Sequence, residues 1–94
     1  ISRILPEGMG VDLSTLFDPS DEMKEIAERS QISSKEFYEV WNGGNGMLLI
    51  VSPEEKDHAL TLLSETTLVA QECGIITDTG KTSLQSFSGE RLEW

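Results

Sequence analysis

A nearly continuous apolar run over residues 46–52, GMLLIVS, most constrains how this chain can fold. Glycine opens the run and Pro53 follows it, and the polar alternation of a one-sided surface strand is missing. Such a run is typical of a strand that is covered on both faces. We therefore predict a strand over 46–52 at the centre of a sheet.

Two helices are predicted before this run, over residues 18–30 and 31–42. The first follows aspartate and serine residues that can cap it, and the second has a capping box made by Ser33 and Glu36. Apolar residues recur on one side of each helix at helical spacing. We expect these side chains to be buried: Met23, Ile26, Ala27, Phe37, Val40 and Trp41.

The segment after the run begins as a third helix, because Ser52 and Glu55 form a second capping box and proline occupies the first helical position. Its expected buried side is Ala59, Leu60, Leu62 and Leu63. A strand over 67–77 follows, in which Gly74 marks a bulge or a close approach. If this strand shares a sheet with 46–52, the connection is a right-handed βαβ crossover.

The two ends of the chain complete the predicted sheet. Residues 1–5 are expected to form a short strand, and residues 11–17 a strand end with one helical turn. The C-terminal residues 81–94 indicate a hairpin around Ser88 and Gly89. The predicted fold class is α+β, a single layered domain with helices packed on a mixed sheet of about four strands and the hairpin at an edge.

The charge of the chain excludes some classes of partner. Seventeen acidic and seven basic residues give a formal net charge of −10 over 94 residues, which disfavours nucleic acid and anionic lipid. No apolar stretch approaches the roughly 20 residues that span a bilayer. A single cysteine excludes an internal disulfide and favours the cytoplasm. The start at Ile1 suggests a piece of a larger protein.

The glycine cluster at residues 42–46, NGGNG, has two open interpretations. A helix C-terminal cap, with Asn42 or Gly43 in the left-handed conformation, explains one or two of the glycines. Close approach to a ligand or a neighbouring backbone would explain the third. A phosphate-binding loop is excluded, because such loops follow a strand and open a helix, whereas here a helix precedes the glycines.

Other single residues carry less information. His58 has no second histidine or nearby cysteine and is expected to be exposed rather than a metal ligand. Cys73 is expected to be a small buried residue rather than a nucleophile. Arg3 lies among apolar residues, where it could be a structural ion-pair partner or an anion contact.

Two motifs resemble a known family. RILPEGMG, at residues 3–10, and EFYEVWNGGNGM, at residues 36–47, are similar to the C-terminal domain of the phosphoribosylformylglycinamidine cyclo-ligases, also called phosphoribosylaminoimidazole (AIR) synthetases. The matched residues are Arg3, Leu5, Pro6, Glu7, Gly8, Glu36, Tyr38, Asn42, Gly44, Gly46 and Met47. The chain departs from the family at Phe37, Glu39, Val40, Trp41 and Asn45, which leaves room for a divergent member.

The resemblance implies a reaction of purine biosynthesis, in which ATP drives closure of the imidazole ring of formylglycinamidine ribonucleotide. It implies that ATP and Mg²⁺ are bound mainly by a missing N-terminal ATP-binding domain, and it allows a homodimer of the full-length enzyme. Arg3, Asn42 and Gly44 would face the ribonucleotide substrate in a cleft between the domains, while no catalytic or metal-binding residue is assigned.

Two other functions remain open from the sequence. One is a non-catalytic α/β module that binds a ligand or a partner by its sheet edge or its glycine turn. The other is the same domain in a related ATP-using enzyme, such as a selenophosphate synthetase-like or hydrogenase-maturation protein.

Overall fold

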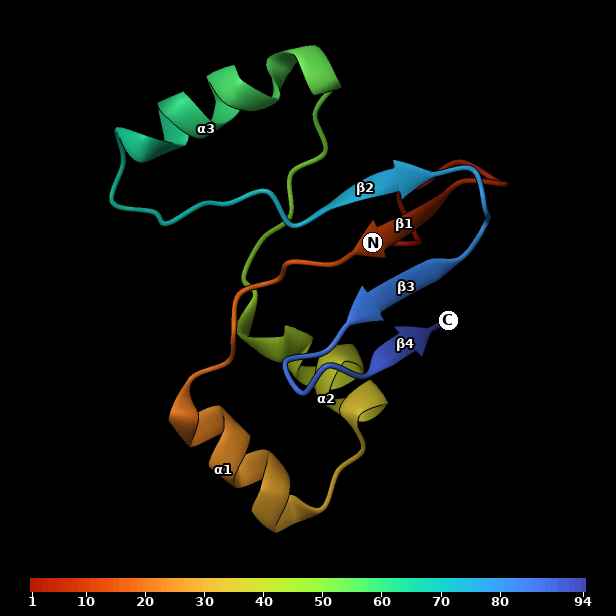
Figure 1. Cartoon of the computed structure of the whole chain (residues 1–94), viewed down its shortest axis with the longest axis vertical. Coiled ribbons are helices and arrows are strands. Elements are labelled where there is room, and N and C mark those ends of the chain that lie inside the picture. Colours follow the sequence, from red (N-terminus) through yellow and green to blue (C-terminus); the bar gives the residue numbers. More distant parts are fainter.

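A mixed four-stranded sheet with the order β2-β1-β3-β4 forms the centre of the molecule (Figure 1). The computed structural model describes all residues, 1–94. β1 (Gly10–Leu13) pairs antiparallel with β2 (Gly74–Thr77) and parallel with β3 (Thr82–Gln85), and β3 pairs antiparallel with β4 (Arg91–Glu93). The predicted α+β class, the mixed sheet and the C-terminal hairpin at an edge are confirmed.

The two predicted N-terminal helices are present as α1 (Asp21–Ser30) and α2 (Ser34–Trp41). Ser20 Oγ accepts a hydrogen bond from the backbone N–H of Met23 at 3.3 Å, and Ser33 Oγ accepts one from that of Glu36 at 3.1 Å. These caps satisfy backbone donors that have no partner inside the helix. Both helices therefore begin where the serines predict.

The core lies between α2 and one face of the sheet. Strand register places Leu13 opposite Leu84, and Leu84 opposite Leu92, so one row of leucines crosses three strands. Phe37 packs on this row and is 1% exposed. The prediction for α2 was wrong at one position, because Val40 is exposed and Tyr38 is buried in its place.

The predicted central strand over 46–52 is absent. β1 holds the central place, and it is hydrogen-bonded on both sides, to β2 and to β3. Residues 46–52 are an extended connection outside the sheet, and all of them are exposed. The prediction was wrong because an apolar pattern identifies a strand-like segment but does not determine which edge it pairs with.

The third helix forms, but its expected buried side is at most half-buried. A 3₁₀ turn, η2 (Pro53–Glu55), leads into α3 (Lys56–Ser64), and neither contributes a buried residue. Ser52 makes no capping bond, so the second capping box was wrong as well. Figure 1 shows α3 beyond the β2 edge of the sheet, at the other end of the molecule from α1. No helix is both long and apolar enough to cross a membrane.

Three further predictions need correction. Residues 1–5 form turns rather than a strand, with the Ile4 N–H bonded to the Ile1 carbonyl at 3.1 Å. Only the last four residues of 67–77 join the sheet, and residues 46–52 do not, so the predicted crossover between these two segments is absent. No helical turn follows β1 before residue 18. Gly74 is a close-approach point, as expected, because a Cβ there would collide with the Asp12 carbonyl.

Candidate functional site

The glycine cluster is a tight left-handed turn at the end of α2. Asn42, Gly43 and Gly44 form a short 3₁₀ turn, η1 (Asn42–Gly44), and have φ angles of 53°, 57° and 84°. A Cβ on Gly43 would overlap the Tyr38 ring, so only glycine fits. The helix-cap interpretation is therefore confirmed, and the close approach at Gly43 is to the chain's own tyrosine.

Asn45 ties this turn to the segment that follows β1. Its Oδ1 accepts a hydrogen bond from the Phe17 N–H at 3.2 Å. Its Nδ2 donates to the carbonyls of Asn42 at 3.2 Å and Gly43 at 3.3 Å. No role was predicted for Asn45 from the sequence. Its position within a glycine turn could have indicated this role. Asparagine side chains in turns often form hydrogen bonds with nearby backbone N–H and C=O groups.

A small cavity of about 120 Å³ lies beside this segment, at the carboxyl ends of the parallel strands β1 and β3. The carboxyl ends of neighbouring parallel strands are a frequent place for ligand sites in α/β sheets. Polar and aromatic groups both line it: Ser14, Leu16, Phe17, Asp18, Tyr38, Gln85, Ser86 and Phe87.

Tyr38 is the best-positioned polar group in this cavity. Its hydroxyl oxygen accepts a hydrogen bond from the Phe87 N–H at 2.9 Å, which leaves the hydroxyl proton free to donate. Burial raises the pKa of Tyr38, and the nearby Asp18 carboxylate adds to the increase. The phenol is therefore a neutral hydrogen-bond donor at neutral pH.

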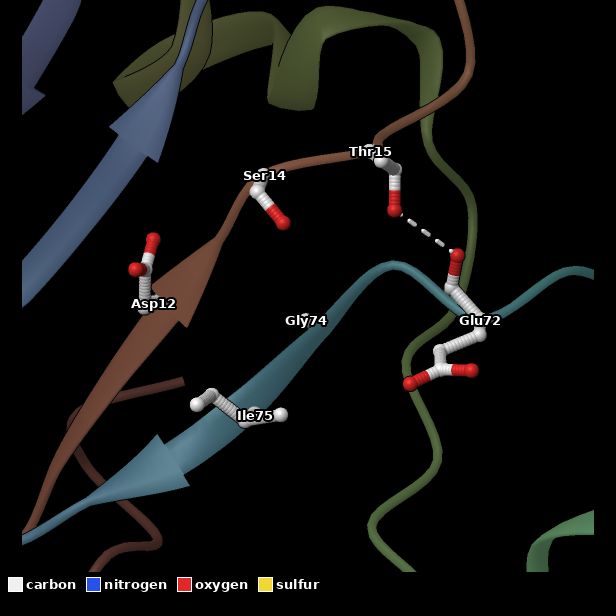
Figure 2. A pocket seen from close by; sticks show the side chains of 6 residues that line it. All are labelled: Asp12, Ser14, Thr15, Glu72, Gly74 and Ile75. Carbon is white, nitrogen blue, oxygen red and sulfur yellow. Dashed lines mark hydrogen bonds between the residues drawn. The ribbon is translucent and has the colours of Figure 1, made fainter.

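A second, wider cavity of about 370 Å³ lies on the other side of the β1 end (Figure 2). It is lined by Asp12, Ser14, Thr15, Glu72, Gly74 and Ile75. Thr15 Oγ1 donates to the Glu72 carbonyl at 2.9 Å and holds the end of β1 against the residues before β2. Both carboxylates in the lining are paired with cations, Asp12 with Arg91 and Glu72 with Lys56.

Asp12 is paired with a cation from β4. Arg91 Nη1 lies 3.0 Å from its Oδ1, and this ion pair is the only polar contact of that buried oxygen. Arg91 Nη2 donates to Ser83 Oγ at 2.8 Å. Hydrogen bonding to Asp12 raises the pKa of Arg91. No group of three or more histidine, cysteine or acidic side chains could hold a metal ion.

The structure brings two of the three predicted site residues together. Asn42 and Gly44 share the turn, and the Asn42 side chain makes no hydrogen bond within the chain. Gly44 lies against α1, where a Cβ would be 3.3 Å from Met23 Sδ. Arg3 precedes β1 in the sequence and is exposed without an ion-pair partner.

The two remaining candidates, His58 and Cys73, differ in exposure. His58 is exposed on α3, as expected, with Nδ1 3.5 Å from Glu55 Oε2. Cys73 is half-buried, and burial raises the pKa of its thiol. Because the thiolate is the reactive form, this cysteine is a poor nucleophile at neutral pH.

A family model and a set of related proteins match this chain, and they agree with each other. The family model described as "AIR synthase related protein, C-terminal domain" matches residues 1–86. The chain is 34% identical over 86 residues to the phosphoribosylformylglycinamidine cyclo-ligase of Bifidobacterium longum (strain DJO10A), covering 89% of this chain and 25% of that protein.

Two other relatives carry the same name. The protein from Oceanobacillus iheyensis is 34% identical over 79 residues, with 83% of this chain and 23% of the relative covered. The protein from the archaeon Methanothermobacter thermautotrophicus is 30% identical over 90 residues, with 95% and 25% covered. The chain thus spans about a quarter of the length of these relatives. No solved structure shows a significant match.

Proposed function

The chain belongs to the AIR synthase related protein C-terminal domain family, and we propose that it is the C-terminal portion of an ATP-dependent cyclo-ligase. The reaction closes the imidazole ring of formylglycinamidine ribonucleotide and gives aminoimidazole ribonucleotide, ADP and phosphate. The observation that carries this proposal is the family match over residues 1–86, together with the relatives from bacteria and an archaeon that bear the cyclo-ligase name.

The glycine turn is the part of this chain that faces the substrate in the proposal. Asn42 is held in the left-handed conformation at the end of α2, and its amide is exposed and unbonded within the chain. Gly44 follows Gly43, and because glycine has no side chain its backbone can come close to a ligand. An amide and an open backbone can together bind the phosphate or the formyl-derived group of a ribonucleotide.

Arg3 has a separate place in the proposal. It is exposed and has no ion-pair partner, which favours the anion-contact interpretation over the structural one. The guanidinium is suited to the phosphate of the ribonucleotide, because its donors match phosphate oxygens in pairs.

ATP and Mg²⁺ fit poorly on this chain alone. No group of three or more acidic, histidine or cysteine side chains could hold the metal. The proposal therefore assigns both to an N-terminal domain of a two-domain enzyme, and the 94 residues are not expected to turn over alone. A homodimer of the full enzyme and a cytoplasmic location belong to the same proposal.

The proposal is tested by supplying the intact protein with formylglycinamidine ribonucleotide, ATP and Mg²⁺. The expected result is formation of aminoimidazole ribonucleotide with one ADP released for each ring closed. ATP hydrolysis without ring closure would point to another ATP-using relative of the same family, and an absence of both reactions would point to a non-catalytic module.

A further inference from the structure

Asn45 makes more hydrogen bonds than any other residue of the glycine turn needs for its own chain direction, and they converge on the turn itself. Its backbone N–H donates to the Asn42 carbonyl at 3.0 Å. Its Nδ2 donates to the same carbonyl at 3.2 Å and to the Gly43 carbonyl at 3.3 Å. No other side chain donates a hydrogen bond to these two carbonyls. One asparagine therefore clamps both peptide groups of the left-handed part of the turn.

The clamp acts on a backbone conformation that is unfavourable by itself. Asn42 has φ of 53° and ψ of 18°, in the left-handed region, which costs energy for a residue with a Cβ. A residue keeps such a conformation when its surroundings hold it there. Gly44 and Gly46, on either side of Asn45, restrict the backbone little, because glycine has no Cβ. The two hydrogen bonds at the Asn42 carbonyl therefore fix the peptide group that follows Asn42.

The other end of the clamp is anchored outside the turn. Asn45 Oδ1 accepts a hydrogen bond from the Phe17 N–H at 3.2 Å, and Phe17 belongs to the connection between β1 and α1. The same connection lines the cavity beside Tyr38. Gly44 adds packing to this anchor, since a Cβ there would lie 3.3 Å from Met23 Sδ. Asn45 thus sets the position of the turn relative to the cavity.

Asn45 and Asn42 differ in what they can offer to a ligand. A side-chain amide carries two N–H donors, and Asn45 uses both within the chain, on the carbonyls of Asn42 and Gly43. It is also half-buried, so it has no donor left for a ligand. Asn42 is exposed, and its amide makes no hydrogen bond within the chain. Any effect of Asn45 on a ligand therefore passes through the residues that it holds.

We propose that Asn45 is a positioning residue, which holds the Asn42 amide in the orientation that meets the substrate. This inference rests on the proposed function, in which the glycine turn faces the ribonucleotide. It adds that substrate binding depends on a residue that does not touch the substrate. Asn45 is one of the positions at which this chain departs from the family motif, so the clamp belongs to this chain and not to the matched residues.

A double-mutant cycle in the intact enzyme tests the proposal. Asn45→Ala is expected to lower kcat/KM for ring closure at least about fivefold, because the Asn42 amide is no longer held toward the substrate. In a protein that already carries Asn42→Ala, the same change is expected to alter kcat/KM by less than about twofold, because the group that Asn45 positions is absent. A drop of the same size in both backgrounds, or no drop in either, would overturn the proposal.

Thr66→Ala is a matched control, because Thr66 also ties a turn in both directions. Its Oγ1 donates to the Leu63 carbonyl at 2.7 Å and accepts from the Leu68 N–H at 3.1 Å, just after α3. This variant should leave kcat/KM unchanged. Hydrogen exchange over residues 42–47, followed by mass spectrometry, should be faster in Asn45→Ala and unchanged in the control.

The two measurements separate this inference from the proposed function. An original enzyme that does not close the ring would overturn the proposed function. Unchanged hydrogen exchange over the turn in Asn45→Ala would overturn the clamp itself, whatever reaction the intact protein performs.

Discussion

Gly43 is the residue at which the geometry of the turn is most sharply determined. Its φ angle is 57°, and a Cβ would overlap the Tyr38 ring in the core. Gly43→Ala is expected to cost about 2–4 kcal/mol, the sum of left-handed strain and displacement of a packed ring. Urea unfolding measures this loss. Gly46→Ala, where no atom lies within 4 Å of the added carbon, should stay within about 0.5 kcal/mol of the original protein.

Tyr38 makes folding stability depend on pH in the alkaline range. Burial, and secondarily Asp18, raises its pKa above the ordinary value of 10.0. The unfolded chain therefore loses the phenol proton first, so the stabilisation is complete below pH 10 and declines as the pH rises through the folded-state pKa.

Tyr38→Phe isolates that contribution. The variant leaves the Phe87 N–H without its acceptor and is expected to lose about 1 kcal/mol near neutral pH. Thermal unfolding of both proteins at about pH 8 and about pH 11 is the measurement. The difference between them should shrink at the higher pH, since the original protein alone carries the Tyr38 titration. A constant difference would show that the phenol titrates normally.

At the scale of whole elements, the helices were predictable because their signals are local. Ser20 and Ser33 cap α1 and α2 through bonds to residues three positions later. The C-terminal hairpin is equally local. The strand order was not predictable, because β1 pairs with β3 across most of the chain and its sequence, GVDL, is too short to stand out. The strongest apolar run was therefore assigned the central place that β1 holds.

Ser33→Ala tests the contribution of one cap to α2. The Glu36 N–H loses its acceptor, and a loss of about 1 kcal/mol is expected. Because α2 carries Phe37 into the core, the loss should appear in the main cooperative unfolding transition measured by circular dichroism. Ser30→Ala at the exposed end of α1 serves as the control and should be nearly neutral.

At the scale of the whole molecule, only part of the candidate site could be predicted from the sequence. The motif match identified the turn, and helix-cap chemistry predicted its left-handed backbone. The cavity beside Tyr38 could not be foreseen, because it forms only when the segments after β1 and β3 meet. The role of Asn45 was missed for the same reason, since its partner Phe17 is distant in sequence.

The claim that the glycine turn faces the substrate is tested most directly by the kcat/KM of Asn42→Ala in the intact enzyme. Gln31→Ala is a matched control, because Gln31 caps α1 in the same left-handed conformation, with φ of 55° against 53° for Asn42. Both variants should lose similar stability. We expect kcat/KM to fall at least about tenfold for Asn42→Ala, as for loss of a substrate hydrogen bond, and to be unchanged for Gln31→Ala. Equal kcat/KM for both variants and the original enzyme would contradict a substrate-facing turn.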